Sequence, residues 1–203
     1  MKLVYGTTNK SKIIYMKRQI EPLGIEVLSL DDVGAPPLSI DECGAGPLEN
    51  AEIKALAYFR ALNMAVFSCD SGLYIKGLED ARQPGVHIRN IEGRRLDDNE
   101  MIEQYSLLAA ELGGSAVARY QNAICLVLDE SRIFRHMDDD IASERFLLVS
   151  NPHWKRVEGF PLDSLSVDIA SGRYYYDIEG YKRKYATDGG GFAAFFKAAL
   201  SIS

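Results

Sequence analysis

The sequence has little cysteine, and its cysteines lack the spacing of a metal-binding motif. Three of the 203 residues are cysteine, namely Cys43, Cys69 and Cys125, and no two of them form a C-x-x-C pair. An odd number of widely spaced cysteines argues against a disulfide framework and against a zinc site. This usage favours a reducing compartment, so we expect a cytoplasmic protein.

The chain also lacks an excess of positive charge and any long apolar run. Lys and Arg number 23 against 29 Asp and Glu, which gives a net charge of -6, whereas a general nucleic-acid binder carries a basic face. No segment is long enough to cross a bilayer, and the start of the chain does not resemble a signal peptide. We therefore expect neither nucleic acid nor membrane as a partner. An anionic small substrate is compatible with this charge, because local lysines and a metal ion override the global sign.

What is present indicates one globular α/β domain over residues 1–203. The hydrophobic content is 47% and the charged content 26%, which is typical of a chain with a real core. Helical periodicity predicts helices at 11–21, 48–62 and 98–112, with another at the C-terminal end after a glycine-rich entry. Strand patterns occur at 2–6, 25–30, 65–69 and 144–150, and a hairpin is expected from 116–129 and 132–137. This order predicts a mixed sheet flanked by helices.

Polar groups gather where the first strand gives way to the first helix. Thr7, Thr8, Asn9 and Lys12 follow an apolar run that ends at Gly6. Helix N-terminal N–H groups, together with these side chains, make a cradle for an anion such as phosphate. An ordinary helix N-cap with lysines facing water explains the same residues. The stretch is not a Walker A loop.

Two carboxylates are candidates for a magnesium site. Glu49 is expected in the first turn of its helix, and Asp70 at the end of a strand, where a tight turn at Ser71-Gly72 would expose it. Magnesium takes few protein oxygens and completes its shell with water and phosphate. Taken separately, each acid also has an ordinary explanation, since Glu complements a helix dipole and Asp before Ser-Gly is common in turns.

Four motifs in register resemble the inosine triphosphate pyrophosphatase family. They are T-x-N-x-x-K at 7–12, E-N-A-x-x-K-A at 49–55, D-S-G-L at 70–73 and P-G-V-H at 84–87. The resemblance implies an elongated mixed sheet in two lobes with a central cleft, and a homodimer. It also implies hydrolysis of non-standard purine nucleoside triphosphates to the monophosphate and pyrophosphate, with Mg²⁺ or alternatively Mn²⁺.

The resemblance assigns roles to individual residues of this chain. Glu49 and Asp70 would bind the metal, and Asp70 would also be catalytic by activating the attacking water. The residues implied in substrate binding are Thr7, Thr8, Asn9, Lys12, Lys54, Ser71, Phe160, Asp163 and Lys184.

The chain departs from the family pattern at three places. Cys69 stands where the family has the first of two adjacent acids, and cysteine is a poor magnesium ligand. The family's F-G-[YW]-D-P reads F-P-L-D-S here, which keeps Phe160 and Asp163; Phe160 either stacks on a base or belongs to the core. The family's K-N-A-x-S-H-R is laid over residues 184–190, where Lys184 is retained and Ser-His-Arg becomes Asp-Gly-Gly.

These departures predict a retained phosphate end and an altered base-reading end. His87 and Arg89 either compensate for the lost Ser-His-Arg or are exposed loop residues, and the glycines either read nothing or offer backbone amides to the ligand. A competing hypothesis is a nucleotide-binding relative without turnover, acting as a sensor. A third is an unrelated α/β domain whose motif matches are accidental caps and turns.

Overall fold

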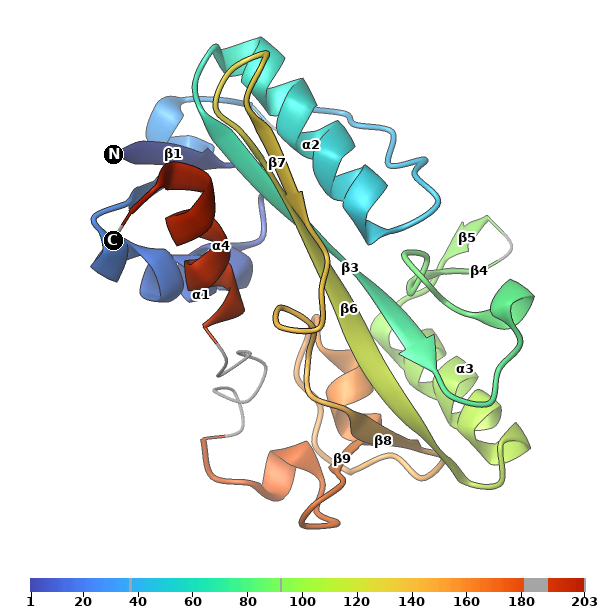
Figure 1. Ribbon diagram of the computed structural model, residues 1–203. Coiled ribbons are helices and arrows are strands. Elements are labelled where there is room, and N and C mark those ends of the chain that lie inside the picture. The colour runs from blue at the N-terminus through green and yellow to red at the C-terminus, as the bar shows by residue number, and fades with distance from the viewer. Residues whose placement is uncertain (37, 92, 181–189, 203) are drawn as a thin grey trace. The chain divides into compact units, whose positions relative to one another are not determined.

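The computed structural model in Figure 1 describes residues 1–36, 38–91, 93–180 and 190–202. The helices are α1 (Lys10–Ile20), α2 (Pro47–Leu62), α3 (Asp98–Glu111) and α4 (Gly191–Leu200). The strands are β1 (Lys2–Tyr5), β2 (Glu26–Leu28), β3 (Val66–Ile75), β4 (Asn90–Ile91), β5 (Arg94–Arg95), β6 (Ser115–Val127), β7 (Ile133–His136), β8 (Phe146–Val149) and β9 (Ser166–Asp168). Among the described residues, no helix combines the length and the hydropathy that crossing a bilayer requires.

The chain divides into two compact units. Unit 1 comprises Met1–Ser71, Gln121–Ala142 and Thr187–Ser203, and unit 2 comprises Gly72–Tyr120 and Ser143–Ala186. The long strands β3 and β6 each contribute residues to both units. The single domain over residues 1–203 and the cleft between two lobes stay predictions.

Unit 1 is built on a mixed sheet. Strand β1 pairs in parallel with β2 and with β3, and β7 pairs antiparallel with β6. The combination of parallel and antiparallel pairs confirms the predicted mixed sheet flanked by helices. The hairpin of β6 and β7 is also confirmed, and its turn is closed by Asp129, whose carboxylate accepts hydrogen bonds from the backbone of Ser131 and Arg132.

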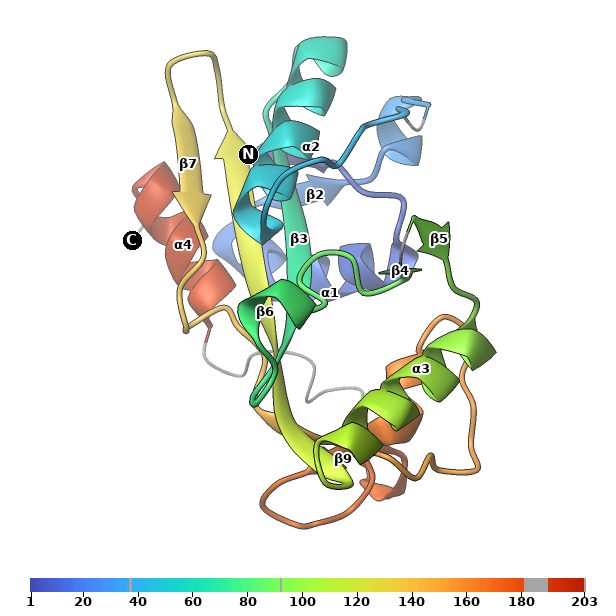
Figure 2. The ribbon, with the colours of Figure 1, turned by 90° about the vertical axis from the view of Figure 1, so that its right-hand side faces the viewer.

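The strands of unit 1 bury alternate residues on opposite faces of the sheet. Tyr5 and Phe67 lie in a buried cluster with residues of α1 and α4. Their neighbours Val4 and Val66 lie in a second cluster with Tyr58 of α2. Because successive side chains of a strand point to opposite faces, α1 and α4 cover one face and α2 covers the other (Figures 1 and 2).

Unit 2 packs α3 against a smaller antiparallel arrangement. The first residues of β6 pair with β8, and β8 pairs with β9. Its core includes Leu73, Met101, Phe146 and Leu165, and helix α3 contributes Met101 to it. The hairpin of β4 and β5 forms a separate two-stranded sheet in this unit.

The helix predictions are confirmed to within about one residue at each end, because local signals define the ends. Asn9 caps α1 by accepting a hydrogen bond from the backbone N–H of Lys12 at 3.1 Å. Pro47 begins α2, and Asp97 forms a capping box with Glu100 at the start of α3. The predicted strand ends are less accurate. The strand predicted at 25–30 is observed as Glu26–Leu28, and the strand predicted at 144–150 is observed as Phe146–Val149.

The strand expected to end at Asp70 was predicted wrongly. Strand β3 runs without a break to Ile75, so Ser71-Gly72 is not a tight turn. The hydroxyl of Ser71 donates to Oδ1 of Asn122 at 2.7 Å, and Leu73 forms a bridge with Gly85. These partners, distant in sequence, satisfy backbone and side-chain hydrogen-bonding groups that a turn would leave exposed.

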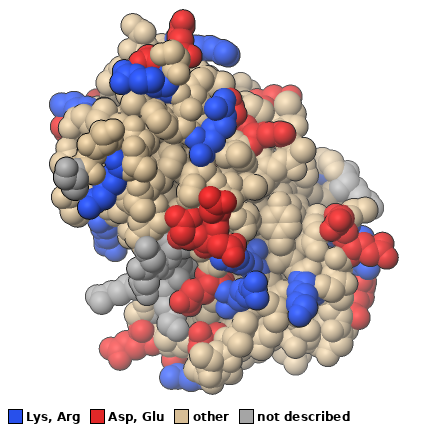
Figure 3. All heavy atoms as spheres, in the orientation of Figure 1, with Lys and Arg blue, Asp and Glu red and all other residues tan. Residues whose placement is uncertain are grey.

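The surface carries both signs of charge. On the face shown in Figure 3, acidic and basic side chains are interspersed, and no continuous basic area is visible. On this face, neither sign of charge dominates.

Candidate active site

The loop that follows β1 is anchored to β3 at its first residue, Gly6. The N–H of Gly6 donates to the carbonyl of Phe67 at 2.9 Å, and the hydroxyl of Ser68 donates to the carbonyl of Gly6 at 3.0 Å. A Cβ at Gly6 would come within 2.8 Å of the Tyr58 ring, so only glycine fits there. The loop therefore presents the start of α1, whose first N–H groups have no partner within the helix.

The polar residues of this loop have partly structural roles. The N–H of Asn9 donates to Oγ1 of Thr7 at 3.2 Å, and Oδ1 of Asn9 caps α1. The N-cap explanation is thus confirmed for Asn9, and its role in substrate binding stays a prediction. Thr8 is exposed and Thr7 is half-buried.

Lys54 of α2 stands between two carboxylates. Its ammonium lies 3.0 Å from Oδ1 of Asp70 in β3 and 2.9 Å from Oε2 of Glu42 in the loop before α2. The side chains of Lys54 and Asp70 are only 13% and 14% exposed, so this contact is largely shielded from water. Burial by itself lowers the pKa of Lys54, but the charges of Asp70 and Glu42 and their hydrogen bonds hold that pKa above its ordinary value.

Lys12 of α1 belongs to the same electrostatic neighbourhood. Burial, followed by repulsion from Lys54, lowers the pKa of Lys12, while the charges of Asp70 and Glu42 oppose that change. Mutual influence of this kind requires the four groups to lie close together. The structure therefore brings Lys54 into direct contact with Asp70, and it adds Glu42. Lys12 lies near enough for their charges to affect its pKa.

Glu42 was missed by the sequence analysis, which assigned no role to the residues between the strand at 25–30 and the helix at 48–62. The available signal was an acid in the loop before the helix of the E-N-A-x-x-K-A motif, which begins at Pro47. The loop packs closely on α2, since a Cβ at Gly44 would lie 2.6 Å from the Cβ of Glu49, and the N–H of Gly44 donates to Oδ1 of Asn50 at 2.8 Å. This packing brings Glu42 to Lys54.

Glu49 has a local partner. Its Oε2 accepts a hydrogen bond from the backbone N–H of Ala45 at 2.6 Å, and it occupies the first turn of α2 as expected. The carboxylate thus stabilises the loop that carries Glu42. Its role as a metal ligand stays a prediction.

Cys69 and Asp70 point to opposite faces of β3. Cys69 belongs to the buried cluster that α1 and α4 cover, whereas Asp70 meets Lys54 of α2 on the other face. Burial raises the pKa of Cys69 to about 11, and the hydroxyl of Tyr5 is its hydrogen-bond partner. The thiol is therefore protonated near neutral pH, as is usual for a cysteine buried in a strand.

The predicted substrate residues of unit 2 lie around a short 3₁₀ helix, Pro161–Leu165. Phe160 precedes it and is 44% exposed, so the alternative that it belongs to the core does not hold. Asp163 is buried, with 7% of its surface exposed, and its N–H donates to the carbonyl of Phe160 at 3.3 Å. Lys184, like Asp188 and Gly189, lies outside the described residues.

Arg89 is committed to the structure of unit 2. Its guanidinium donates to Oδ1 of Asp98 at 2.8 Å and to the carbonyl of Gly159 at 3.2 Å. The N–H of Gly159 donates in turn to Oδ2 of Asp98 at 2.7 Å. Arg89 thus joins the start of α3 to the segment before Phe160.

The donor set of unit 1 suits a magnesium ion. Within the described ranges, no group of three or more His, Cys, Asp or Glu residues is arranged to hold a metal. Magnesium, however, is commonly bound by one or two carboxylates, with water and substrate phosphates completing its shell. Asp70 and Glu42, which share Lys54, supply hard oxygen donors of this kind.

The fold is that of Ham1 proteins. The structure of the Staphylococcus aureus Ham1 protein aligns with a TM-score of 0.70 and 19% identity over 99% of this chain and 98% of that one. A HAM1 protein from Coxiella burnetii aligns with a TM-score of 0.75 and 21% identity over 100% and 98% of the two chains. At these identities the likeness establishes the fold class, and the predicted mixed α/β fold with helices flanking the sheet is confirmed.

Sequence comparison gives the family. A protein of Rhodopseudomonas palustris named dITP/XTP pyrophosphatase is 32% identical over 136 residues, which are 65% of this chain and 63% of the relative's length. A Bacillus subtilis protein of the same name is 32% identical over 148 residues, or 70% of this chain and 72% of the relative. The sequence model of the Ham1 family matches residues 3–142, and the chain belongs to that family.

Proposed function

We propose that this protein hydrolyses non-standard purine nucleoside triphosphates to the nucleoside monophosphate and pyrophosphate, and so removes them from the nucleotide pool. The observation that carries the proposal is the contact of Lys54 with Asp70 and Glu42 beside Lys12 and the start of α1. Family membership and the names of the relatives support the same activity.

Two lysines and the N–H groups of α1 suit the binding of a polyphosphate. Lys12 and Lys54 supply positive charge, and the helix start adds its dipole. Thr7, Thr8, Asn9 and Ser71 offer small polar side chains for orientation. Positive charge is most useful where negative charge accumulates on the departing pyrophosphate, so these groups favour the transition state over the bound substrate.

Asp70 is suited to take a proton from water. Lys54 contacts Oδ1, and within the described part of the chain no hydrogen bond involves Oδ2. In the proposed step a water oxygen bonds to the α-phosphorus while Asp70 accepts a water proton, and the bond from that phosphorus to the bridging oxygen breaks. The electron pair leaves with pyrophosphate.

Mg²⁺, or Mn²⁺ in its place, fits the carboxylates of this site. Asp70 and Glu42 would hold it, with Glu49 as the further ligand that the motif implies; when bound, the ion would neutralise phosphate charge. At the other end of the substrate, we assign Phe160 to stacking on the base and Asp163 to orienting it. Lys184 is assigned as a third cation.

A pyrophosphate-release assay tests the proposal. The panel comprises the triphosphates of inosine, deoxyinosine and xanthosine, the four standard ribonucleotides, and either Mg²⁺ or Mn²⁺. We expect release that depends on the metal and is fastest with one or more of the non-standard purines. Silence across the panel, with nucleotide binding measurable by calorimetry, would favour a binding protein without turnover. Silence without binding would remove the nucleotide assignment altogether.

We also infer a cytoplasmic location and a homodimer. The free cysteines support the first, because Cys43, Cys69 and Cys125 form no disulfide. The motif resemblance supports the second. Light scattering after size-exclusion chromatography measures the mass directly: about twice the 22.6 kDa of one chain supports the dimer, and a single-chain mass contradicts it.

A further inference from the structure

The hairpin of β4 and β5 has one face on the core of unit 2 and one face away from it. Its register sets Asn90 opposite Arg95 and Ile91 opposite Arg94. Ile91 packs against the unit 2 core, and Arg94 pairs with Glu100 of α3. Residues directly opposite each other share a face and neighbours alternate. Asn90 and Arg95 therefore project together from the other face.

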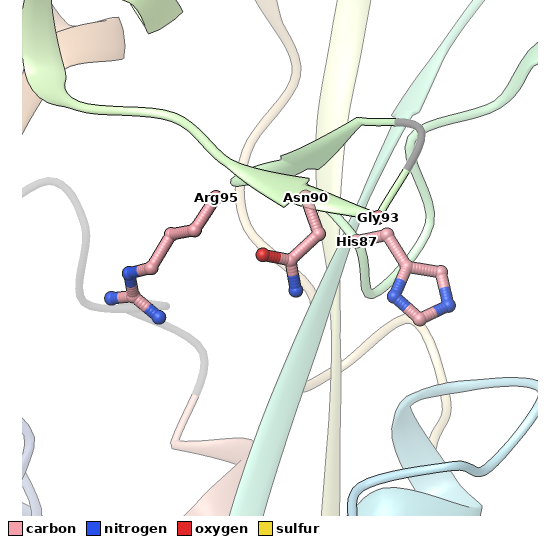
Figure 4. A pocket seen from close by; sticks show the side chains of 4 residues that line it. All are labelled: His87, Asn90, Gly93 and Arg95. Atoms are coloured by element: carbon pink, nitrogen blue, oxygen red, sulfur yellow. The ribbon is translucent and has the colours of Figure 1, made fainter.

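That other face lines a hollow of about 520 Å³, bordered by His87, Asn90, Gly93 and Arg95. Figure 4 shows the side chains of Arg95, Asn90 and His87 extending from the same side of the hairpin. The volume of this hollow lies within the range of roughly 300–1,000 Å³ that is usual for small-molecule sites. We call it the β4–β5 hollow.

Backbone contacts set the position of each lining residue. The N–H of His87 donates to the carbonyl of Pro84 at 2.9 Å, and the N–H of Asn90 donates to the carbonyl of His87 at 2.9 Å. Gly93 has a φ of +78°, a conformation that side chains disfavour. The polar side chains therefore extend from a backbone that hydrogen bonds already fix.

Among the residues that the structure describes, no acidic side chain pairs with the arginine of the β4–β5 hollow. Two arginines near Arg95 in the sequence have acidic partners: Arg89 pairs with Asp98, and Arg94 pairs with Glu100. Arg95, in contrast, makes no hydrogen bond or ion pair within the part of the chain that the structure describes, and none of the described lining residues is acidic. An exposed guanidinium beside an amide and an imidazole is a set of N–H donors that matches the oxygens of a phosphoryl group.

We propose that the β4–β5 hollow binds the phosphoryl group of a small molecule, with inorganic phosphate as the minimal ligand. Arg95 holds two phosphate oxygens with its guanidinium, while His87 and Asn90 donate to the same group. The described lining residues all belong to unit 2, whereas Lys12, Lys54 and Asp70 belong to unit 1. Phosphate binding in the hollow does not depend on the proposed hydrolysis.

Histidine ring resonances in NMR spectra test this proposal. The chain has three histidines, His87, His136 and His153, which single substitutions assign. Phosphate is added at constant ionic strength, with chloride as the control titrant. We expect the His87 signals alone to shift and to saturate, and a sugar phosphate to bind at least as tightly, because the hollow exceeds the size of phosphate.

Two adjacent arginines provide a matched pair of variants. Arg95→Gln is expected to weaken the phosphate binding reported by His87 by about tenfold or more, because it removes the charged guanidinium and its paired N–H donors. Arg94→Gln removes the same charge from the opposite face and is expected to change the affinity by less than about twofold. Unchanged His136 and His153 signals verify that both variants fold. An equal loss of phosphate affinity in the two variants would show that only general surface charge matters, and the proposed site would be wrong.

A third variant separates this site from the one in unit 1. With Lys12→Gln, the phosphate-dependent shift of His87 is expected to persist at the original affinity. Its disappearance would show that both observations report one site, and the proposal would fail. A His87 signal that responds to citrate but not to phosphate, or that does not respond at all, would overturn the ligand class.

Discussion

The ammonium of Lys54 in α2 lies 3.0 Å from Oδ1 of Asp70 in β3. The contact exists because β3 directs Asp70 to the sheet face that α2 covers, while Cys69 points to the opposite face. Asp70 of β3 and Glu42 of the loop before α2 therefore both contact the ammonium of Lys54. Both the charge balance and the geometry of the candidate site depend on this lysine.

Replacing Lys54 by methionine is expected to lower stability by about 1–3 kcal/mol, because Asp70 would then be a shielded charge without its partner. Urea denaturation monitored by circular dichroism measures the change. The exposed pair of Lys2 and Glu26 is the control, since its side chains are 64% and 55% exposed, and Lys2→Met is expected to cost less than about 0.5 kcal/mol. Equal costs for the two variants would contradict the structural importance of the Lys54 contact.

Asp70→Asn is expected to abolish pyrophosphate release while the protein stays folded. The amide keeps the shape of the carboxylate but accepts no proton from water and binds magnesium poorly. We expect a loss of at least about a hundredfold in kcat, the usual contribution of a positioned base. Release rates with the best substrate of the panel provide the measurement, and circular dichroism provides the control for folding. Hydrolysis at the rate of the unmodified protein would show that Asp70 is not the base.

The sequence predicted those elements whose signals are local. Asn9 and Asp97 are the N-caps of α1 and α3, and Pro47 is the first residue of α2, so each helix start depends on a residue located there. Asp129 likewise closes the turn of the hairpin through contacts within three residues. Such features depend on a few neighbouring residues and can be recognised in a single sequence.

The features that the sequence did not predict depend on distant partners. The turn expected at Ser71 is instead continuous strand, because Ser71 hydrogen-bonds with Asn122, 51 residues away. Glu42 is close to Lys54 because the preceding loop packs on α2. Neither partner can be recognised from local periodicity, so the sequence anticipated only part of the set of acids that we propose as metal ligands.

Thiol labelling is expected to distinguish the cysteines sharply. Burial raises the pKa of Cys69 to about 11 and that of Cys125 to about 12, so both are protonated near neutral pH, whereas Cys43 is exposed. We expect iodoacetamide to modify one of the three thiols rapidly in the folded protein and all three in denaturant. Mass spectrometry locates the label. A Cys43→Ser variant that still labels rapidly would contradict the burial of the other two.

Lys12 is expected to make substrate affinity depend on alkaline pH. Its pKa lies below the ordinary value of 10.5, mainly because of burial and secondarily because of repulsion from Lys54. Only the protonated form attracts a polyphosphate, so affinity is lost as the pH rises through that lowered pKa. The pKa of Lys54 is raised instead, and Lys54 therefore stays charged over the same interval. We expect KM for the triphosphate to rise before the pH reaches 10.5.

Lys12→Arg isolates this effect, because a guanidinium stays protonated up to a pH of about 12 or more. Ionisation of the substrate affects both proteins alike, so the ratio of their KM values reports the state of Lys12 alone. We expect that ratio, unmodified protein over variant, to increase with pH as the lysine is deprotonated. A constant ratio would mean that Lys12 keeps its charge throughout or does not contact the phosphates, and a titration of the lysine signal by NMR separates these two cases.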